Sequence, residues 1–473
     1  MPVQCASAGV DAAVGEAAVG VLAEHAAVLD GVGGVGGTSV LECFASVSDP
    51  RDPRGVRYSL PTLLGLCVAA VVSDQKSLVE ITSWIRAASQ QVLAGLGVRP
   101  NRQGVCVAPH PDTVTRLLCA LGAQGLADAV GAWLASRAQL GPVTTPVDGT
   151  VTTPAEDAVD GTPEDMAEGT AEGTEGTAEG TVLRPGVAFD GKAMRNAIGP
   201  DGQIPYLLAA ATHGESVVIA ERLVGAKSNE VPSVDPLLRQ IAPKLAGTVL
   251  TMDALHTVRA HAHFIVEELR AHYVMTVKEN TPNLFDRINA LDWASTPIAH
   301  TTTNVGHGRH EKRTIQVMNA PEDLGFPHAA QVFLIERYTT RTIRRRVKGS
   351  HKYRKVKVKS AVAVLGVTSL AATEATPERL ATYVRGHWSI ENKIHWVRDV
   401  TFGEDASHVR TGSRPRVMAT LRNLAIGLIR QAGHTKIAAT LRQIRNYPHL
   451  LLPILGLSEP QNTAPDQHKR LCA

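Results

Sequence analysis

Cysteine is scarce and scattered in this chain. Its six cysteines, at positions 5, 43, 67, 106, 119 and 472, include no C-x-x-C pair. Neither a zinc site nor a disulfide framework is therefore indicated, and free thiols fit a reducing cytoplasm.

Long apolar runs are also missing. The longest, at about 60–73, is too short to span a bilayer and predicts a buried helix. The first residues lack a basic start followed by a sustained apolar core, which argues against a signal peptide. With 44% hydrophobic residues the chain can still build a sizeable core. We therefore expect a cytoplasmic protein without a membrane partner.

One stretch lacks lysine and arginine altogether. Residues 140–183 hold ten acidic residues and four copies of Glu-Gly-Thr, with little to bury, so a disordered acidic linker is predicted over 140–184. The rest of the chain has 48 basic residues against 35 of the 45 acidic ones, about +13 instead of +3. Such a body attracts a polyanion. The linker either competes with that polyanion for the basic surface or, in the favoured interpretation, is a tolerated repeat expansion.

Three acidic residues stand at positions suited to a metal site. Asp190 and Asp253 each close a short β-prone run, which predicts two strands with an acid at the end. Glu391 lies in a predicted helix. Its neighbours on one face of an α-helix would be His387, Trp388, His395 and Arg398. Hard cations take carboxylate oxygens, and two ions about 3.5–4 Å apart can drive phosphodiester chemistry. The alternative for the Glu391 segment is a surface helix with a solvated charge stripe.

A series of short motifs follows in one order along the chain. The motifs are Phe-Asp-Gly-Lys (189–192), Lys-Ser-Asn-Glu (227–230), Met-Asp-Ala-Leu-His-Thr (252–257), Tyr-Val-Met-Thr-Val-Lys-Glu-Asn (273–280), Gly-His-Gly-Arg-His-Glu (306–311), Gly-His-Trp-Ser-Ile-Glu-Asn (386–392), Asp-Val-Thr-Phe-Gly-Glu-Asp (399–405) and Leu-Arg-Asn-Leu-Ala-Ile (421–426). In this series the chain resembles DDE transposases of bacterial insertion sequences, in the H-repeat-associated or ISAs-type branch. The resemblance covers roughly residues 41–455, apart from the acidic segment.

The resemblance implies an α/β fold in which an RNase H-like catalytic domain, 185–457, carries a β-rich insertion at about 285–375. An all-helical domain, 39–139, would precede it as a candidate region for DNA contact, with tails at 1–38 and 458–473. The resemblance also makes Asp190, Asp253 and Glu391 the catalytic acids and the ligands of two Mg²⁺ ions, for which Mn²⁺ could substitute.

The resemblance further suggests groups that bind phosphate or DNA. His387 stands where relatives have an arginine four residues before the glutamate, and Arg398 where they have a basic residue seven after it. Arg385 is displaced from the usual spacing. Lys278, at a predicted strand end, is either near phosphate or simply an exposed lysine. Trp388 and Trp396 would either stack a displaced base or, in the favoured interpretation, pack in the core.

Two other groups compete as metal ligands. Glu404 and Asp405 are rival acids, although the favoured interpretation is that they form a cap or pair with Arg410. His256, His261 and His263 suggest zinc, but no companion cysteine or H-x-x-x-H pair supports a cage. We therefore expect these histidines to lie at the surface or behind the site.

The most basic segment lies between Asp253 and Glu391. Ten lysines and arginines fall within residues 341–359 without an acid, and residues 353–365 alternate, which predicts a β-hairpin with a basic tip. So dense a cluster is costly unless it is solvated or meets phosphate. Contact with the DNA backbone is the favoured interpretation, and an idle solvated hairpin is the alternative. The hairpin residues proposed for this contact are Arg344, Arg345, Arg346, Lys352, Arg354 and Lys355.

The region before the linker reads as helices at 61–73, 77–88, 112–121 and 126–137, with Asp112 as an N-cap. Some of its arginines would contact phosphate or only be solvated. They are Arg51, Arg54, Arg57, Arg99, Arg102 and Arg116.

Together these features predict a DNA transposase that cleaves insertion-sequence ends and transfers the strands into target DNA. Double-stranded DNA would be the partner, and pairing of two ends implies a homodimer. A repurposed RNase H-like DNA nuclease and a non-catalytic DNA-binding descendant are the alternatives. The complete acidic triad argues against the second.

Overall fold

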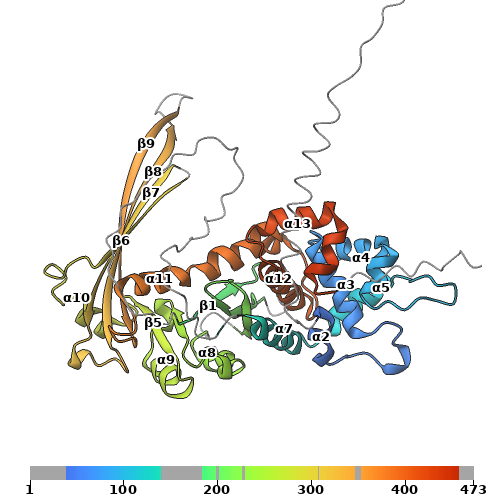
Figure 1. Ribbon diagram of the computed structural model, residues 1–473, viewed down its shortest axis with the longest axis horizontal. Coiled ribbons are helices and arrows are strands. Elements are labelled where there is room, and N and C mark those ends of the chain that lie inside the picture. Colours follow the sequence, from blue (N-terminus) through green and yellow to red (C-terminus); the bar gives the residue numbers. More distant parts are fainter. Residues whose placement is uncertain are drawn as a thin grey trace, which may run out of the picture. The chain divides into compact units, whose positions relative to one another are not determined.

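The computed structural model describes residues 39–138, 140, 184–198, 202–225, 230–306, 308–346 and 353–457 (Figure 1). The predicted tails, nearly all of the acidic linker and Lys352 lie outside these ranges.

The first described part of the chain is built from helices. Ser59 accepts a hydrogen bond from the Thr62 amide and so caps the apolar helix α3, while Ser77 and Glu80 form a capping box on α4. The predicted cap of α6 is wrong: the His110 side chain accepts from the Asp112 amide, and Asp112 lies within the first turn. The helices are α2 (Val40–Cys43), α3 (Leu60–Val72), α4 (Leu78–Ala87), α5 (Gln90–Gly95), α6 (Pro111–Ala120) and α7 (Ala123–Arg137).

A mixed sheet follows. Its first three strands are antiparallel neighbours, and the next two run parallel to the first. These strands are β1 (Gly186–Ala193), β2 (Tyr206–Thr212), β3 (Val218–Val224), β4 (Val249–Met252) and β5 (His272–Val277). The connecting helices are α8 (Glu230–Arg239) and α9 (Arg259–His263), the latter continuing as a π-helical segment, η6 (Phe264–Glu268).

Four further strands extend the same sheet, which has the order β3-β2-β1-β4-β5-β9-β8-β7-β6. Because β9 pairs antiparallel with β5, the predicted β-rich insertion continues the sheet. The predicted hairpin is confirmed, with β8 and β9 paired from Gln331 and Thr368 out to Arg346 and Tyr353 (Figure 1). The elements are α10 (Pro282–Asn289), β6 (His300–Gly306), β7 (Arg309–Asn319), β8 (Gln331–Arg346) and β9 (Tyr353–Thr368).

The Glu391 segment is helical but is not wound as an α-helix. Helix α11 (Pro377–His387) is followed by two π-helical segments, η8 (Ile390–His395) and η9 (Val397–Thr401). A π-helix bonds residue i to i+5, so the α-helical spacing that put Arg398 on the face of Glu391 does not hold. The last helices of the described ranges are α12 (Arg414–Gln431), α13 (Ile437–Asn446) and α14 (Leu451–Ile454).

One apolar core joins the early helices to α12. It includes Leu63 and Leu66 of α3 and Leu421 and Leu428 of α12. Helix α7 also lies against β3, and a Cβ at Gly131 would come 2.6 Å from the carbonyl oxygen of Ile219.

The helices carry no clear membrane span. No single helix in the described ranges is long and apolar enough to cross a bilayer, and only α6 and α7 pass that test together, as a pair bent by 90°. Both contribute side chains to the α3–α12 core.

Candidate active site

The two aspartates lie at the same end of adjacent parallel strands. In the β1–β4 register Ala188 faces Thr251, and Asp190 and Asp253 each stand two residues further along. Asp253 follows β4 and caps the next turn, accepting a hydrogen bond of 3.0 Å from the Leu255 amide. The strand pairing therefore brings the two carboxylates to one edge.

Glu391 reaches this pair from the π-helical segment. Burial, reinforced by the negative charges of Asp190 and Asp253, raises the pKa of Glu391, and Lys278 opposes the shift. The three predicted acids and the predicted lysine are thus close enough to influence one another. Lys278 is exposed just beyond β5.

Two histidines support the Asp190 side of this cluster. Nδ1 of His395 lies 3.4 Å from Oδ2 of Asp190. Although burial acts to raise the pKa of Asp190, its interactions with His395 and His387 hold that pKa below its ordinary value. His395 was noted from sequence only as a neighbour of Glu391; its contact with Asp190 had no signal in the sequence.

His387 lies beneath the aspartates, away from the surface. It is 7% exposed, and its Nδ1 lies 3.4 Å from the Thr251 hydroxyl, which in turn is 2.8 Å from Nε2 of His213. Burial lowers the pKa of His387 even though Asp190 and Asp253 oppose the shift. This position does not offer the ring to a DNA phosphate, contrary to the sequence-based expectation.

Arg398 also departs from expectation. It is fully buried, and its guanidinium donates to both carboxylate oxygens of Glu404 at 2.9 and 2.6 Å. Arg422 binds the same carboxylate at 3.1 Å. A phosphate-binding role for Arg398 is therefore wrong in this structure, because its donors serve an internal ion cluster.

Of the two rival acids, Glu404 is part of this ion cluster and Asp405 lies beside Lys192. Burial alone would raise the pKa of Glu404, but Arg398 and Arg422 lower it to about 2. The expected pairing with Arg410 is wrong, since the Nε of Arg410 donates to the carbonyl of Asn196. Asp405 lies 3.9 Å from the Lys192 ammonium.

Lys192, from the Phe-Asp-Gly-Lys motif, links β1 to the segment after Glu391. Its ammonium is nearly buried and lies 2.6 Å from Asp399.

The two tryptophans beside Glu391 are not core residues: Trp388 is 49% and Trp396 42% exposed. The favoured packing interpretation is therefore wrong for both.

The basic hairpin exposes its charges. Cross-strand pairing sets Arg344 opposite Lys355 and Arg345 opposite Arg354, and all four side chains are exposed, as is Arg346. Arg385 lies elsewhere, half-buried on α11 with its guanidinium beside the Asn304 amide of β6.

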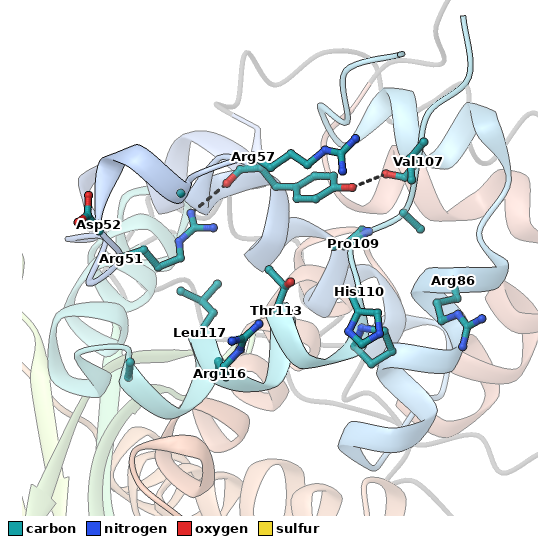
Figure 2. Close-up of a pocket in the computed structure, with 15 residues that line it drawn as sticks. Arg51, Asp52, Arg57, Arg86, Val107, Pro109, His110, Thr113, Arg116 and Leu117 are labelled. Carbon is teal, nitrogen blue, oxygen red and sulfur yellow. Dashed lines mark hydrogen bonds between the residues drawn. The ribbon is translucent and has the colours of Figure 1, made fainter. Parts of the chain in front are cut away.

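Several early arginines converge on a cavity of about 930 Å³ between the N-terminal helices and their loops. Figure 2 shows Arg57, Arg86 and Arg116 around it, together with His110. Arg51 also lines it but is held by Asp49 at 2.6 Å. None of the three candidate catalytic acids lines this cavity, and Arg86 had not been singled out from sequence.

Of the three histidines for which zinc was the disfavoured interpretation, His256 and His261 are buried and His263 is exposed. His256 pairs with Glu230 at 3.6 Å, while His261 is within hydrogen-bonding distance of the carbonyls of His256 and Val231. Among the described residues, a group able to hold an ion is formed instead by exposed His263, Glu267 and His328. Glu267 Oε1 lies 2.7 Å from His263 and 2.8 Å from His328.

Two family models match the chain, one over the N-terminal helices and one over the sheet and the helices that follow it. The family described as "Transposase DDE domain" matches residues 184–428, more than half of the chain, with Asp190, Asp253 and Glu391 inside the match. The chain belongs to the transposase DDE-domain family. The family described as "DDE_Tnp_1-associated" matches residues 41–134, over the N-terminal helices. The resemblance stated from sequence is confirmed.

Relatives in Escherichia coli are consistent with this membership. YhhI of strain K12, named as an H repeat-associated transposase, is 26% identical over 288 residues, 58% of this chain and 72% of its own length. YbfL of strain K12 has the same identity and coverage. YncI of strain O157:H7, named as a transposase, is 26% identical over 258 residues, 53% of this chain and 63% of its own length.

Among solved structures, the piggyBac transposase in a synaptic complex with hairpin DNA is similar at a TM-score of 0.39 and 11% identity. The match covers 88% of this chain and 77% of that one.

Proposed function

We propose that this chain is a DNA transposase that cleaves the ends of an insertion sequence and transfers them into target DNA. The observation that carries the proposal is the 3.4 Å contact between Asp190 and His395, because His395 belongs to η8, the segment that also carries Glu391. The β1–β4 register supports it by setting Asp253 at the same strand end as Asp190. Family membership supports it. Cytoplasmic location and a homodimer on DNA remain predictions.

The sheet supports an RNase H-like catalytic domain. Three antiparallel strands, β1 to β3, are followed by β4 and β5 parallel to β1, in the order β3-β2-β1-β4-β5. A three-stranded start of the sheet is what the sequence predicts for such a domain. The sheet holds Asp190 and Asp253 on rigid strands while Glu391 arrives from a separate helical segment.

The acidic cluster fits divalent metal. Three carboxylates repel one another beside one exposed lysine, and hard oxygen donors suit Mg²⁺ or Mn²⁺. Asp190, Asp253 and Glu391 would hold two ions. When bound, these would activate the attacking oxygen and stabilise the leaving oxygen of a phosphodiester.

The residues around the acids have separate tasks. His395 fixes the Asp190 carboxylate through its 3.4 Å contact. Lys278 stands exposed beside Glu391, where its charge could hold a phosphate of the strand being cut. Water would attack the phosphorus and break its bond to the 3′-oxygen, which leaves a 3′-hydroxyl and a 5′-phosphate. That hydroxyl would then attack the phosphorus of a target phosphodiester and displace the 3′-oxygen of the target strand, so that each step forms one P–O bond and breaks one.

DNA would be held by the basic surfaces. Like charges directly opposite each other on a β-ladder destabilise it, so the pairs of the β8–β9 hairpin gain from a bound polyanion. Arg57, Arg86 and Arg116 around the N-terminal cavity offer a second such surface (Figure 2).

The proposal is tested with labelled DNA carrying the flanking element ends, plus Mg²⁺, for wild type, Glu391→Gln and Glu378→Gln. Glu378 is an exposed carboxylate of α11 and serves as the matched control. We expect cleavage and joining by the wild type and the control, and binding alone by Glu391→Gln. Cleavage without joining would point to a nuclease, and binding without cleavage by the wild type to a non-catalytic descendant.

A further inference from the structure

A fourth carboxylate lies behind the two aspartates. Glu230 is the first residue of α8 and is only 2% exposed. A buried carboxylate loses its water, so each of its oxygens must find a partner or a cation. The contacts of Glu230 can therefore be followed oxygen by oxygen.

One carboxylate oxygen faces the two segments that carry the aspartates. Oε2 of Glu230 lies 3.6 Å from Nε2 of His256, three residues after Asp253. The same oxygen would lie 3.1 Å from a Cβ at Gly191, the residue after Asp190. That Cβ would also collide with the ring of Tyr206, so a glycine is required where Glu230 and Tyr206 close over β1.

The pKa of Tyr206 responds to Glu230 and to both aspartates. Burial raises the pKa of Tyr206, and the charges of Glu230, Asp190 and Asp253 raise it further, together with a hydrogen bond to Glu230. The phenol is thus within electrostatic reach of all three acids.

The other carboxylate oxygen of Glu230 is unsatisfied. Among the described residues, Oε1 is buried without a hydrogen-bond donor. His256 does not compensate for it, because its Nδ1 is likewise buried and unpartnered within the described part of the chain. A desolvated carboxylate oxygen with no donor is a ready ligand for a hard cation.

We propose that Glu230 is a fourth carboxylate of the metal centre and that its Oε1 is an additional oxygen ligand beside Asp190 and Asp253. The inference rests on the proposed function, since it assumes that the aspartates hold divalent ions. Glu391 and Glu230 then supply oxygens from two different elements. Water and phosphate oxygens fill the coordination positions of Mg²⁺ or Mn²⁺ that carboxylates leave open, and Oε1 of Glu230 would take one of these positions.

The test measures direct binding of Mn²⁺ to the full-length chain without DNA. Binding is monitored by calorimetry and by the electron paramagnetic resonance signal of free Mn²⁺. All proteins carry His328→Ala, so that the exposed histidine cluster contributes no ion. Asp253→Asn reports loss of the aspartate site. Asp235→Asn, a half-exposed carboxylate on the same helix as Glu230 that pairs with Arg239, is the control. Melting temperatures without metal show which variants are folded.

We expect Glu230→Gln to weaken Mn²⁺ binding about tenfold or more, or to remove one bound ion, while Asp235→Asn binds as the parent does. Glutamine has nearly the shape of glutamate but lacks its negative charge, so Glu230→Gln removes the anionic ligand with little change in packing. Unchanged binding by this variant would overturn the inference and leave the proposed function standing. Parent protein that binds no more Mn²⁺ than Asp253→Asn would overturn both.

A second variant covers the case in which Glu230→Gln fails to fold. Glu230→Asp keeps the charge but withdraws its oxygens from the aspartates. We expect it to melt with the parent in the absence of metal and to bind Mn²⁺ more weakly. Binding equal to that of the parent would overturn the inference.

Discussion

At the scale of single residues, the molecule separates two kinds of charged group that look alike in sequence. Asp190, Asp253 and Glu391 remain partly accessible and repel one another. Glu404 and Arg398, a few residues further on, neutralise each other in the interior. The first kind is available for a cation, and the second holds the protein together.

The Glu404 cluster makes the first stability prediction. Removing one partner of a buried ion pair leaves the other charge uncompensated, which costs about 3–5 kcal/mol. We expect that loss in the free energy of unfolding for Glu404→Gln, which strands Arg398 and Arg422. Arg410→Gln, an exposed control, should stay near the wild type in denaturant titrations. A large loss in the control with none in Glu404→Gln would contradict the observed pairing.

The same carboxylate predicts a pH dependence. Its pKa is about 2 in the folded chain against an ordinary 4.5, so between these values the unfolded chain binds the proton more tightly. The stability that Glu404 contributes is therefore complete above about pH 4.5 and is lost as the pH falls toward 2. The difference in unfolding free energy between wild type and Glu404→Gln, measured across this range, should shrink on acidification. A difference that stays constant with pH would count against the ion cluster.

At the scale of elements, α7 and the β8–β9 hairpin differ in how they meet their surroundings. Helix α7 lies so close to β3 that position 131 has no room for a side chain. The β8–β9 hairpin, in contrast, carries opposed arginines and lysines into solvent.

Position 131 tests the approach of α7 to the sheet. Gly131→Val places carbon against the Ile219 carbonyl and should destabilise the chain by about 1–3 kcal/mol through overpacking. Gly125→Ala on the same helix has open space around it and should gain up to about 1 kcal/mol from helix propensity. Denaturant midpoints of the two variants should therefore move in opposite directions.

The hairpin tests DNA binding. Changing Arg344, Arg345 and Lys355 to glutamine should weaken binding to DNA of any sequence. It should also reduce the slope of log affinity against log salt by about 0.9 for each phosphate that the variant no longer neutralises. Fluorescence anisotropy over a salt series measures both, with Arg442→Gln on α13 as an exposed control. Equal slopes for the triple variant and wild type would show that the hairpin is solvated and idle.

At the scale of the whole molecule, two family matches share one hydrophobic core. Val40 onward forms a single compact unit, and α12 packs on both α3 and α7. The helical part is thus a structural partner of the catalytic part, whatever its interaction with DNA.

Truncation tests that dependence. A chain beginning at residue 184 would expose the buried face of α12, so we expect it to lack a cooperative melting transition and to aggregate. A chain beginning at residue 39 should melt with the full-length protein. A sharp, independent transition for the shorter fragment would show that the catalytic part folds alone.

Local sequence was sufficient for much of this protein. Apolar runs ending in acids predicted β1 and β4, and alternation predicted the β8–β9 hairpin, because strand formation and turn chemistry depend on neighbours in the chain. Helices α3, α4, α6 and α7 lie within a few residues of their predicted ranges. Sequence and resemblance together also put Asp190, Asp253 and Glu391 forward as one candidate site.

Only the tertiary structure decided which charges face solvent. Arg398, His387 and Glu230 share residue types with exposed binding groups, yet the packing of other elements around them buries them against Glu404, Thr251 and His256. The π-helical winding after α11 likewise changed the face that Glu391 presents. Whether a charged side chain is buried and paired depends on which other segments pack against it. The residue periodicity of its own segment carries no information about that packing.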